Sequence, residues 1–142
     1  MYTIDTESLY KRQIGRKSVN LNAYQRYAPS LLRLGIALVF LYFSISQLTA
    51  PEDWTGFLPK FLRSSPTPET FILANGGFEL AAGILLILGV WVRPVALLLA
   101  LHLAGIVFTL GFNSIAARDF GLMVATFVVF LNGKDAWCLR RK

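Results

Sequence analysis

The amino-acid sequence predicts an all-α membrane protein built as a bundle of four transmembrane helices. Of its 142 residues, 55% are hydrophobic and 15% are charged, and the mean hydropathy is +0.55. A soluble domain is typically about 45–50% apolar and about 25% charged. A chain of this size and composition has too little polar surface to cover itself in water, so its surface is expected to face lipid.

Four apolar runs supply the predicted helices. Crossing a hydrocarbon core of about 30 Å takes about 20 helical residues, and each run reaches or approaches that length. In chain order they are residues 30–48, 71–91, 94–112 and 115–131, the last of them extending toward Gly133. We therefore expect a transmembrane domain over residues 30–133, between basic tails at 1–29 and 134–142.

The basic residues predict how the bundle is oriented. Ten of the 14 lie in the two tails or in the turn that contains Arg93, whereas only Lys60 and Arg63 lie on the opposite side. Segments rich in Lys and Arg stay in the cytoplasm, so both termini are expected to be cytoplasmic, which agrees with an even number of spans. The net charge of +6 therefore sets topology and gives little support to a nucleic-acid partner.

The connection between the first two spans is expected to be an interfacial segment. It is too apolar for a solvated loop, and too short and too often interrupted by proline to cross the membrane. Two interpretations are open: a cover over the outer mouth of the bundle, or a plain aromatic anchor at the lipid headgroups. The segment covers residues 49–70 and contains Pro51, Trp54, Phe57, Leu58, Pro59, Phe61, Leu62, Pro66 and Pro68.

Polar residues inside the predicted spans are the candidate functional residues, because an ionisable group in a bilayer needs a partner or a water-filled cavity. On the first span, Arg33, Ala37, Phe40, Ser44 and Gln47 recur at steps of four, three, four and three. Those steps keep all five on one helical face. A face that carries Arg33 and Gln47 should look into the bundle rather than at lipid.

Glu79 and His102 are expected to form the centre of a polar site. Both fall near mid-membrane, on consecutive antiparallel spans joined by a short turn. A hydrogen bond between them is therefore geometrically feasible. Gly76 and Gly83 flank Glu79 at helical spacing and would permit close approach of a neighbouring helix.

The fourth span begins with the charged neighbours Arg118 and Asp119, near the outer interface. Arg118 would cap the polar site from outside, under the proline-rich segment. Each candidate also has a purely structural interpretation. Arg118 and Asp119 could orient the start of their helix, and Glu79 could be a neutral or hydrogen-bonded packing device. His102 could be a satisfied interior histidine, and the side chain of Arg33 could reach the interface.

Several chemistries are excluded. Cys138 is the only cysteine and His102 the only histidine, so neither a disulfide framework nor a conventional Cys/His metal site can form within the chain. The sequence has no Gly-rich phosphate loop after a strand, no nucleophile elbow and no CxxC pair. It therefore contains no metal or nucleotide motif.

Three stretches of the sequence resemble the DoxX-like family of small four-helix membrane proteins. They are RLGIALVFLYFSISQL, NGGFELAAGILLILGVWVRPVALLLALHLAG and ARDFGLMVATFVVFLNG, and the resemblance covers roughly residues 31–133. Its most specific parts are Glu79 before a small-residue stretch and the pair Arg118 and Asp119; Arg33 fits as well. Where many relatives end the first span with Gly-x-x-Lys, this chain has Ser44 and Gln47.

The resemblance implies a quinone-linked or other redox complex in the cytoplasmic membrane of a prokaryote. The family includes subunits similar to the DoxD part of thiosulfate:quinone oxidoreductase. Our leading hypothesis is a membrane subunit that binds a quinone or a small oxidised substrate, with Glu79 and His102 as catalytic residues that exchange protons. Electrons would come from a redox partner protein. The expected substrate-binding residues are Arg33, Gln47, Arg118 and Asp119.

Two other hypotheses belong to different functional classes. In the first, the protein is a non-catalytic membrane anchor or assembly subunit, which binds a partner membrane protein through the polar face of the first span and its small-residue faces. In the second, a homo-oligomer forms a pathway for a small solute or for protons. All three hypotheses place the chain in the lipid bilayer.

Overall fold

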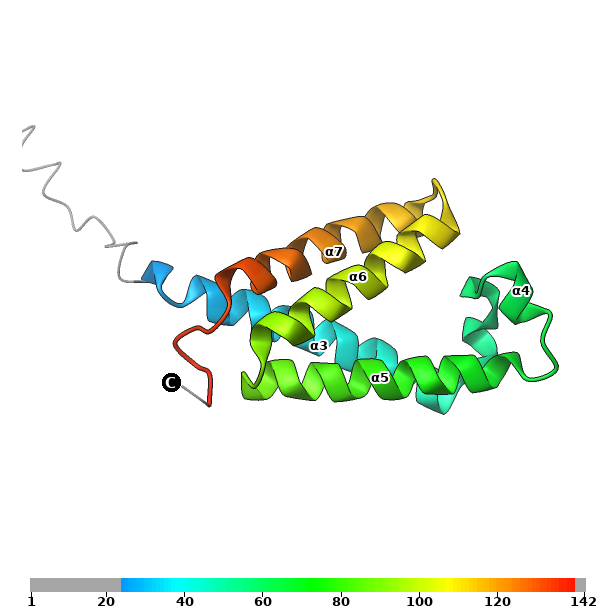
Figure 1. Cartoon of the computed structure of the whole chain (residues 1–142), viewed down its shortest axis with the longest axis horizontal. Helices are drawn as coiled ribbons and strands as arrows, with labels where there is room; N and C mark the ends of the chain where they lie inside the picture. The colour runs from blue at the N-terminus through cyan, green and yellow to red at the C-terminus, as the bar shows by residue number, and fades with distance from the viewer. Residues whose placement is uncertain (1–23, 140–142) are drawn as a thin grey trace, which may run out of the picture.

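The computed structural model describes residues 24–139, and this part of the chain is helical without a strand. It contains four helices long and apolar enough to cross a membrane, which confirms the predicted four-helix membrane fold. A 3-10 helix and a short α-helix lie between the first two of them. The elements are α3 (Ala28–Thr49), η1 (Pro51–Phe57), α4 (Lys60–Arg63), α5 (Pro68–Leu88), α6 (Val92–Leu110) and α7 (Ser114–Asn132) (Figure 1).

Local sequence signals explain where the helices begin and end. The start of α5 has Pro68 in its first turn, where proline's missing N–H costs nothing. The side chain of Asn113 caps α7 by accepting a hydrogen bond of 2.8 Å from the backbone N of Ala116. The second span ends at Leu88 rather than at the predicted Trp91, because Gly89 terminates α5 in the left-handed conformation with a φ of 67°.

The four long helices run up and down and form two pairs. α3 packs mainly against α5, and α6 packs mainly against α7. The pairs lie close together at one end, where the α5–α6 turn and the segment after α7 are found; we call this the closed end. At the other end α6 and α7 rise away from α5, toward the side where α4 lies (Figure 1), and we call this the open end.

Glycines on α5 permit its close contact with α3. A Cβ built at Gly76 would lie 3.1 Å from Cβ of Gln47 and 3.2 Å from the backbone O of Ser44. A Cβ at Gly83 would lie 3.0 Å from Cδ2 of Leu41. The close helix approach expected at these two glycines is therefore present.

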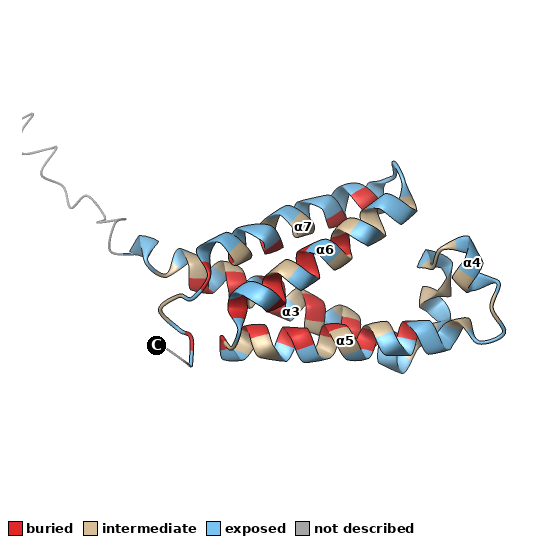
Figure 2. Ribbon diagram, viewed as in Figure 1, coloured by how far each residue is buried: buried red, intermediate tan, exposed pale blue. Residues whose placement is uncertain are grey.

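The core lies along the facing surfaces of the helices and is densest toward the closed end (Figure 2). The predicted inward face of α3 is confirmed, because the five residues that define it are all buried: Arg33, Ala37, Phe40, Ser44 and Gln47. The apolar core consists mainly of Ile36, Ala37, Phe40, Ala82, Leu86, Val92, Val95, Ala96, Leu99, Leu103 and Val129.

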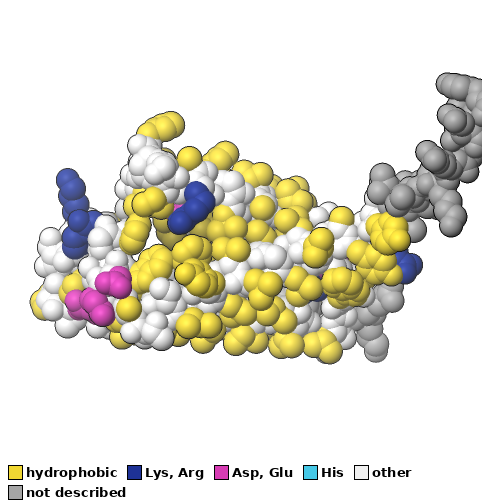
Figure 3. Space-filling model, turned by 180° about the vertical axis from the view of Figure 1, so that it is seen from behind, with side chains coloured by type: hydrophobic (Ala, Val, Ile, Leu, Met, Phe, Trp, Pro, Cys, Tyr) yellow, Lys and Arg dark blue, Asp and Glu magenta, His cyan; other side chains and the backbone are white. Residues whose placement is uncertain are grey.

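The outward faces of the helices are also apolar, as a lipid environment requires. Figure 3 shows hydrophobic side chains over most of the length of one side of the molecule, with a hollow near the end that carries acidic side chains. Leucine and aromatic side chains on all four helices are exposed, among them Leu31, Tyr42, Leu73, Leu98, Phe108, Phe127 and Leu131. Apolar surface of this extent is rare on soluble monomers.

We predict that Gly76→Ala destabilises the bundle, whereas Gly77→Ala does not. The new Cβ at residue 76 meets the backbone of α3, and overpacking of this kind costs about 1–3 kcal/mol. A Cβ at residue 77 has no neighbour within 4 Å, so this variant gains only helix propensity, up to about 1 kcal/mol. Thermal unfolding in detergent measures both variants. Equal melting temperatures for the two variants would contradict the close contact between α3 and α5 at Gly76.

Candidate functional site

A cavity of about 530 Å³ lies between the two helix pairs toward the open end. Its volume falls within the range of about 300–1,000 Å³ that is typical of small-molecule sites. All four long helices line it, together with η1 and α4. Most of its wall is apolar or aromatic, from residues such as Phe40, Phe43, Phe71, Leu101, Ile106, Ile115 and Leu122.

One side of the cavity carries a hydrogen-bonded group of polar side chains from three helices, which we call the Glu79 cluster: Gln47, Asn75, Glu79 and His102. Nε2 of Gln47 donates to Oε2 of Glu79 at 3.0 Å. Nδ2 of Asn75 donates to Oε1 of Glu79 at 3.1 Å and to Oε1 of Gln47 at 2.8 Å. Nε2 of His102 lies 3.1 Å from Oε1 of Glu79, so the expected hydrogen bond between the two is present.

Burial differs across the Glu79 cluster. Glu79 is 3% exposed, and its carboxylate oxygens accept hydrogen bonds from amide groups on α3 and α5 and lie beside the imidazole of α6. The side chain of His102 is 23% exposed and packs edge-on against the ring of Phe78, with 5.3 Å between ring centroids. The carboxylate is therefore shielded behind the imidazole, and the imidazole is the more accessible of the two titratable groups.

A charged pair on α7 forms the opposite wall of the cavity. Nε of Arg118 donates to Oδ1 of Asp119 at 2.8 Å; Asp119 is buried, whereas the side chain of Arg118 is 57% exposed. The guanidinium carbon of Arg118 also lies 5.3 Å from the ring centroid of Phe43 on α3, within the range of a cation–π contact. Arg118 thus spans the gap between α7 and α3 beside the cavity.

The proline-rich segment covers the cavity at the open end. Trp54 packs edge-on against Phe43 with 5.6 Å between ring centroids, and its Nε1 donates to Oγ of Ser46 at 3.2 Å. These contacts fix η1 against the end of α3. The residues of this segment that line the cavity are Trp54, Phe57, Leu58, Pro59 and Leu62, and we call them the roof.

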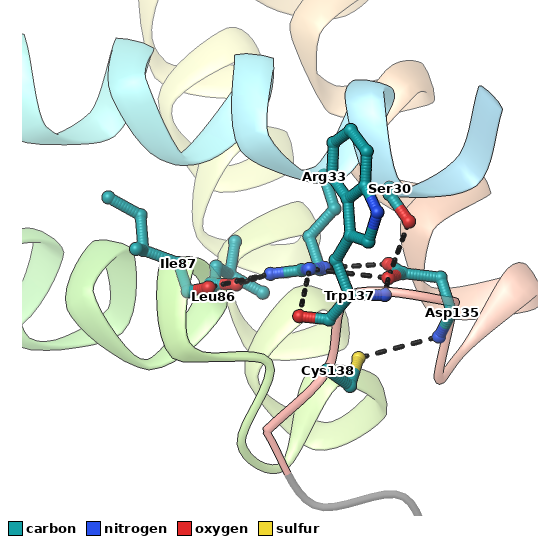
Figure 4. Close-up of polar contacts among 7 residues, drawn as sticks. All are labelled: Ser30, Arg33, Leu86, Ile87, Asp135, Trp137 and Cys138. Carbon is teal, nitrogen blue, oxygen red and sulfur yellow. Dashed lines mark hydrogen bonds and ion pairs between the residues drawn. The ribbon is translucent and has the colours of Figure 1, made fainter. Parts of the chain in front are cut away.

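Arg33 does not lie at the cavity; it is buried at the closed end (Figure 4). Nε and Nη2 of Arg33 donate to the two carboxylate oxygens of Asp135, at 2.7 and 3.3 Å. Nη1 donates to the backbone oxygens of Leu86 and Ile87, and Nη2 also donates to the backbone oxygen of Trp137 at 3.4 Å. All five N–H groups of the guanidinium therefore have a protein partner.

The segment after α7 packs onto the closed end. Oδ1 of Asp135 accepts hydrogen bonds from Oγ of Ser30 at 2.7 Å and from the backbone N of Trp137 at 2.9 Å. The backbone N of Leu139 donates to the backbone O of Leu88 at 3.1 Å. Residues 134–139 of the predicted basic tail thus contact the bundle. Residues 140–142 and most of the tail predicted at 1–29 lie outside the described residues.

Two members of these clusters were not identified from the sequence. Asn75 lies one helical turn before Glu79, and a polar amide at that spacing inside an apolar run was the available signal. Asp135 is the only acidic residue in the predicted tail 134–142. A buried Arg33 requires a partner, but no local pattern in the sequence indicates that this partner is Asp135, 102 positions away.

Comparison with known families identifies the chain. A family model described as DoxX matches residues 28–111, which is more than half of the chain. The chain belongs to the DoxX family. The match runs from α3 through α6 and so includes Arg33 and the whole Glu79 cluster, whereas Arg118 and Asp119 on α7 lie beyond it. No curated protein and no solved structure matches the chain.

We predict that Asp135→Ala strongly destabilises this DoxX protein. The substitution leaves the guanidinium of Arg33 buried without its carboxylate, and breaking a buried pair in this way typically costs about 3–5 kcal/mol. Asp53→Ala is the matched control, because Asp53 is exposed on η1. Thermal unfolding in detergent compares the two variants. A melting temperature for Asp135→Ala equal to that of the control would contradict the structural role of the ion pair.

The same ion pair predicts acid sensitivity of this DoxX protein. Burial raises the pKa of Asp135, but hydrogen bonds from Arg33, Ser30 and the backbone N of Trp137 outweigh burial and lower the pKa from 3.8 to about 2. A carboxyl whose pKa is lower in the folded state stabilises the fold above the unfolded pKa, and this stabilisation is lost as pH falls through the folded pKa. The excess stability of the wild type over Asp135→Asn should therefore shrink as pH falls from 3.8 toward 2, measured by thermal unfolding. A constant difference over that range would contradict the assignment.

Proposed function

We propose that this DoxX protein is the membrane subunit of a redox system and binds a quinone in the cavity between the helix pairs. The observation that carries the proposal is a buried carboxylate, Glu79, hydrogen-bonded to an imidazole at the side of an otherwise apolar cavity. An aromatic and aliphatic wall suits a planar apolar ring, and a small number of convergent polar groups suits its carbonyl oxygens.

Glu79 and His102 supply proton exchange in this proposal. Reduction of a quinone to its quinol adds a hydrogen atom to each carbonyl oxygen, so electrons and protons are consumed in equal number. Nε2 of His102 shares a hydrogen bond with Oε1 of Glu79, and a proton can pass along that bond. A partner protein that carries a redox centre supplies the electrons.

The other polar residues of the cavity orient the reacting groups. Gln47 and Asn75 donate hydrogen bonds to the carboxylate of Glu79 from two sides, which fixes its plane relative to the cavity. Arg118 faces the cavity from α7 and stabilises negative charge that develops on the ligand. Arg33 has all of its donors engaged at the closed end, and we assign it to the fold rather than to the ligand.

We further propose that the open end faces away from the cytoplasm of a prokaryotic inner membrane. Arg93 and Lys134 lie beside the closed end, and Lys60 and Arg63 lie on α4 at the open end. Together with the basic tails in the sequence, this distribution supports a cytoplasmic closed end. The cavity would then open toward the outer half of the bilayer.

We predict that Glu79→Gln weakens quinone binding at least tenfold. Trp54 lines the cavity, so in a chain carrying Trp91→Phe and Trp137→Phe its fluorescence reports on the ligand site alone. The protein is placed in lipid nanodiscs and titrated with a short-chain benzoquinone, which should quench Trp54. The substitution replaces one oxygen of Glu79 by an NH₂ group that cannot accept a hydrogen bond, and this disturbs the imidazole that faces the ligand. A polar interaction lost in this way is worth about 1.5–3 kcal/mol, which corresponds to a tenfold or greater loss of affinity.

Glu69→Gln is the matched control, because Glu69 is an exposed glutamate in the first turn of the same helix. Its affinity should equal that of the wild type. Equal affinities for the Glu79 and Glu69 variants would contradict the role of Glu79 in binding. Absence of any saturable quenching in the wild type would overturn the proposal and favour a non-catalytic anchor subunit.

A further inference from the structure

The cavity has a side opening between α5 and α6. These two helices contact each other far less than α3 contacts α5 or α6 contacts α7. Four residues that line the cavity along this gap are also exposed, with Phe71 at 41% and Leu101 at 62%. We call this opening the α5–α6 window; its residues are Phe71 on α5 and Leu101, Gly105 and Thr109 on α6.

The centre of the α5–α6 window is open space. A Cβ built at Gly105 would have no neighbour within 4 Å. Gly105 lies one helical turn from His102, whose partly exposed ring lines the same cavity. The three window residues of α6 extend over about 12 Å of helix at 1.5 Å per residue. The window thus leads from the side of the bundle to the Glu79 cluster.

The two sides of the cavity differ in charge. Phe71, Leu101 and Gly105 present apolar surface to the bilayer, and the neighbouring Leu73 and Phe108 are also exposed apolar side chains. On the opposite side, Arg118 lies over Phe43 and places a cation in the gap between α3 and α7. At the open end the roof lines the cavity and is itself fixed to α3 by the contacts of Trp54. The α5–α6 window is therefore a less polar exit for a hydrocarbon chain than the gap between α3 and α7, which contains Arg118.

We infer that the ligand is a membrane-dissolved amphiphile, whose polar head group contacts the Glu79 cluster while its long hydrocarbon tail leaves through the α5–α6 window into the bilayer. This inference rests on the proposed function and narrows its ligand class to long-tailed quinones. A cavity of about 530 Å³ holds the head group, and the tail remains among lipid chains. Keeping the tail in lipid avoids exposing its apolar surface to water, which is unfavourable.

A size series at Gly105 tests the inference. Gly105→Ala, Gly105→Leu and Gly105→Phe fill the window progressively, and Gly121→Phe is the matched control, because Gly121 is an exposed glycine on α7 with no neighbour within 4 Å of its built Cβ. Affinities are measured in nanodiscs by quenching of Trp54, with a benzoquinone that carries a long isoprenoid chain and with the same ring without the chain. Thermal unfolding of every variant verifies that it is folded.

We expect the affinity for the tailed quinone to fall at least tenfold by Gly105→Phe and by less in Gly105→Leu. The affinity for the tailless ring should change no more than about threefold, and Gly121→Phe should change neither. Equal losses of affinity for the two quinones, or no loss for either, would contradict the exit of the tail through the α5–α6 window. The proposed function would remain intact. Failure of both quinones to bind the wild type would instead overturn the proposed function.

Discussion

The buried guanidinium of Arg33 holds the closed end of the bundle together. It binds a carboxylate that follows α7 and two backbone carbonyls in the last turn of α5, while its own backbone belongs to α3. A single side chain thereby joins three elements, and at a helix C-terminus a cation also complements the macrodipole. Because the closed end is fixed in this way, α6 and α7 can diverge from α3 and α5 only at the other end. The cavity follows from that divergence.

Arg33 and Glu79, two buried ionisable side chains of the bundle, are satisfied in different ways. Every N–H of Arg33 is bound to protein, and the group has no further capacity for a ligand. The carboxylate of Glu79 also has polar partners on three helices, but one of them, His102, is partly exposed and lines the cavity. The guanidinium of Arg33 is therefore fully enclosed, whereas the Glu79 cluster has two partly exposed members, Asn75 and His102, at the cavity. This asymmetry separates two polar groups that look alike in the sequence: one has no donor left for a ligand, and the other faces a cavity.

Much of the fold could be predicted from the sequence, because helical periodicity and span length are local properties. The inward face of α3 and the pairing of Glu79 with His102 follow from spacing and depth alone. The angle between the helix pairs does not, since it depends on side-chain packing between elements distant in sequence. Asp135 was missed for a related reason: it lies in a short, mostly basic segment, and only the folded chain places it beside Arg33. The ligand roles assigned to the site residues stay predictions.

The distance along the chain between Arg33 and Asp135 has a consequence for biosynthesis. At about 5–20 residues per second, the ribosome adds Asp135 roughly 5–20 s after Arg33. The first helix is therefore made, and can enter the bilayer, while its arginine lacks the carboxylate that later neutralises it. Until then the long side chain can extend to the lipid headgroups, since Arg33 lies in the second turn of α3. Arg33 thus gains its carboxylate partner only after all four long helices have been synthesised.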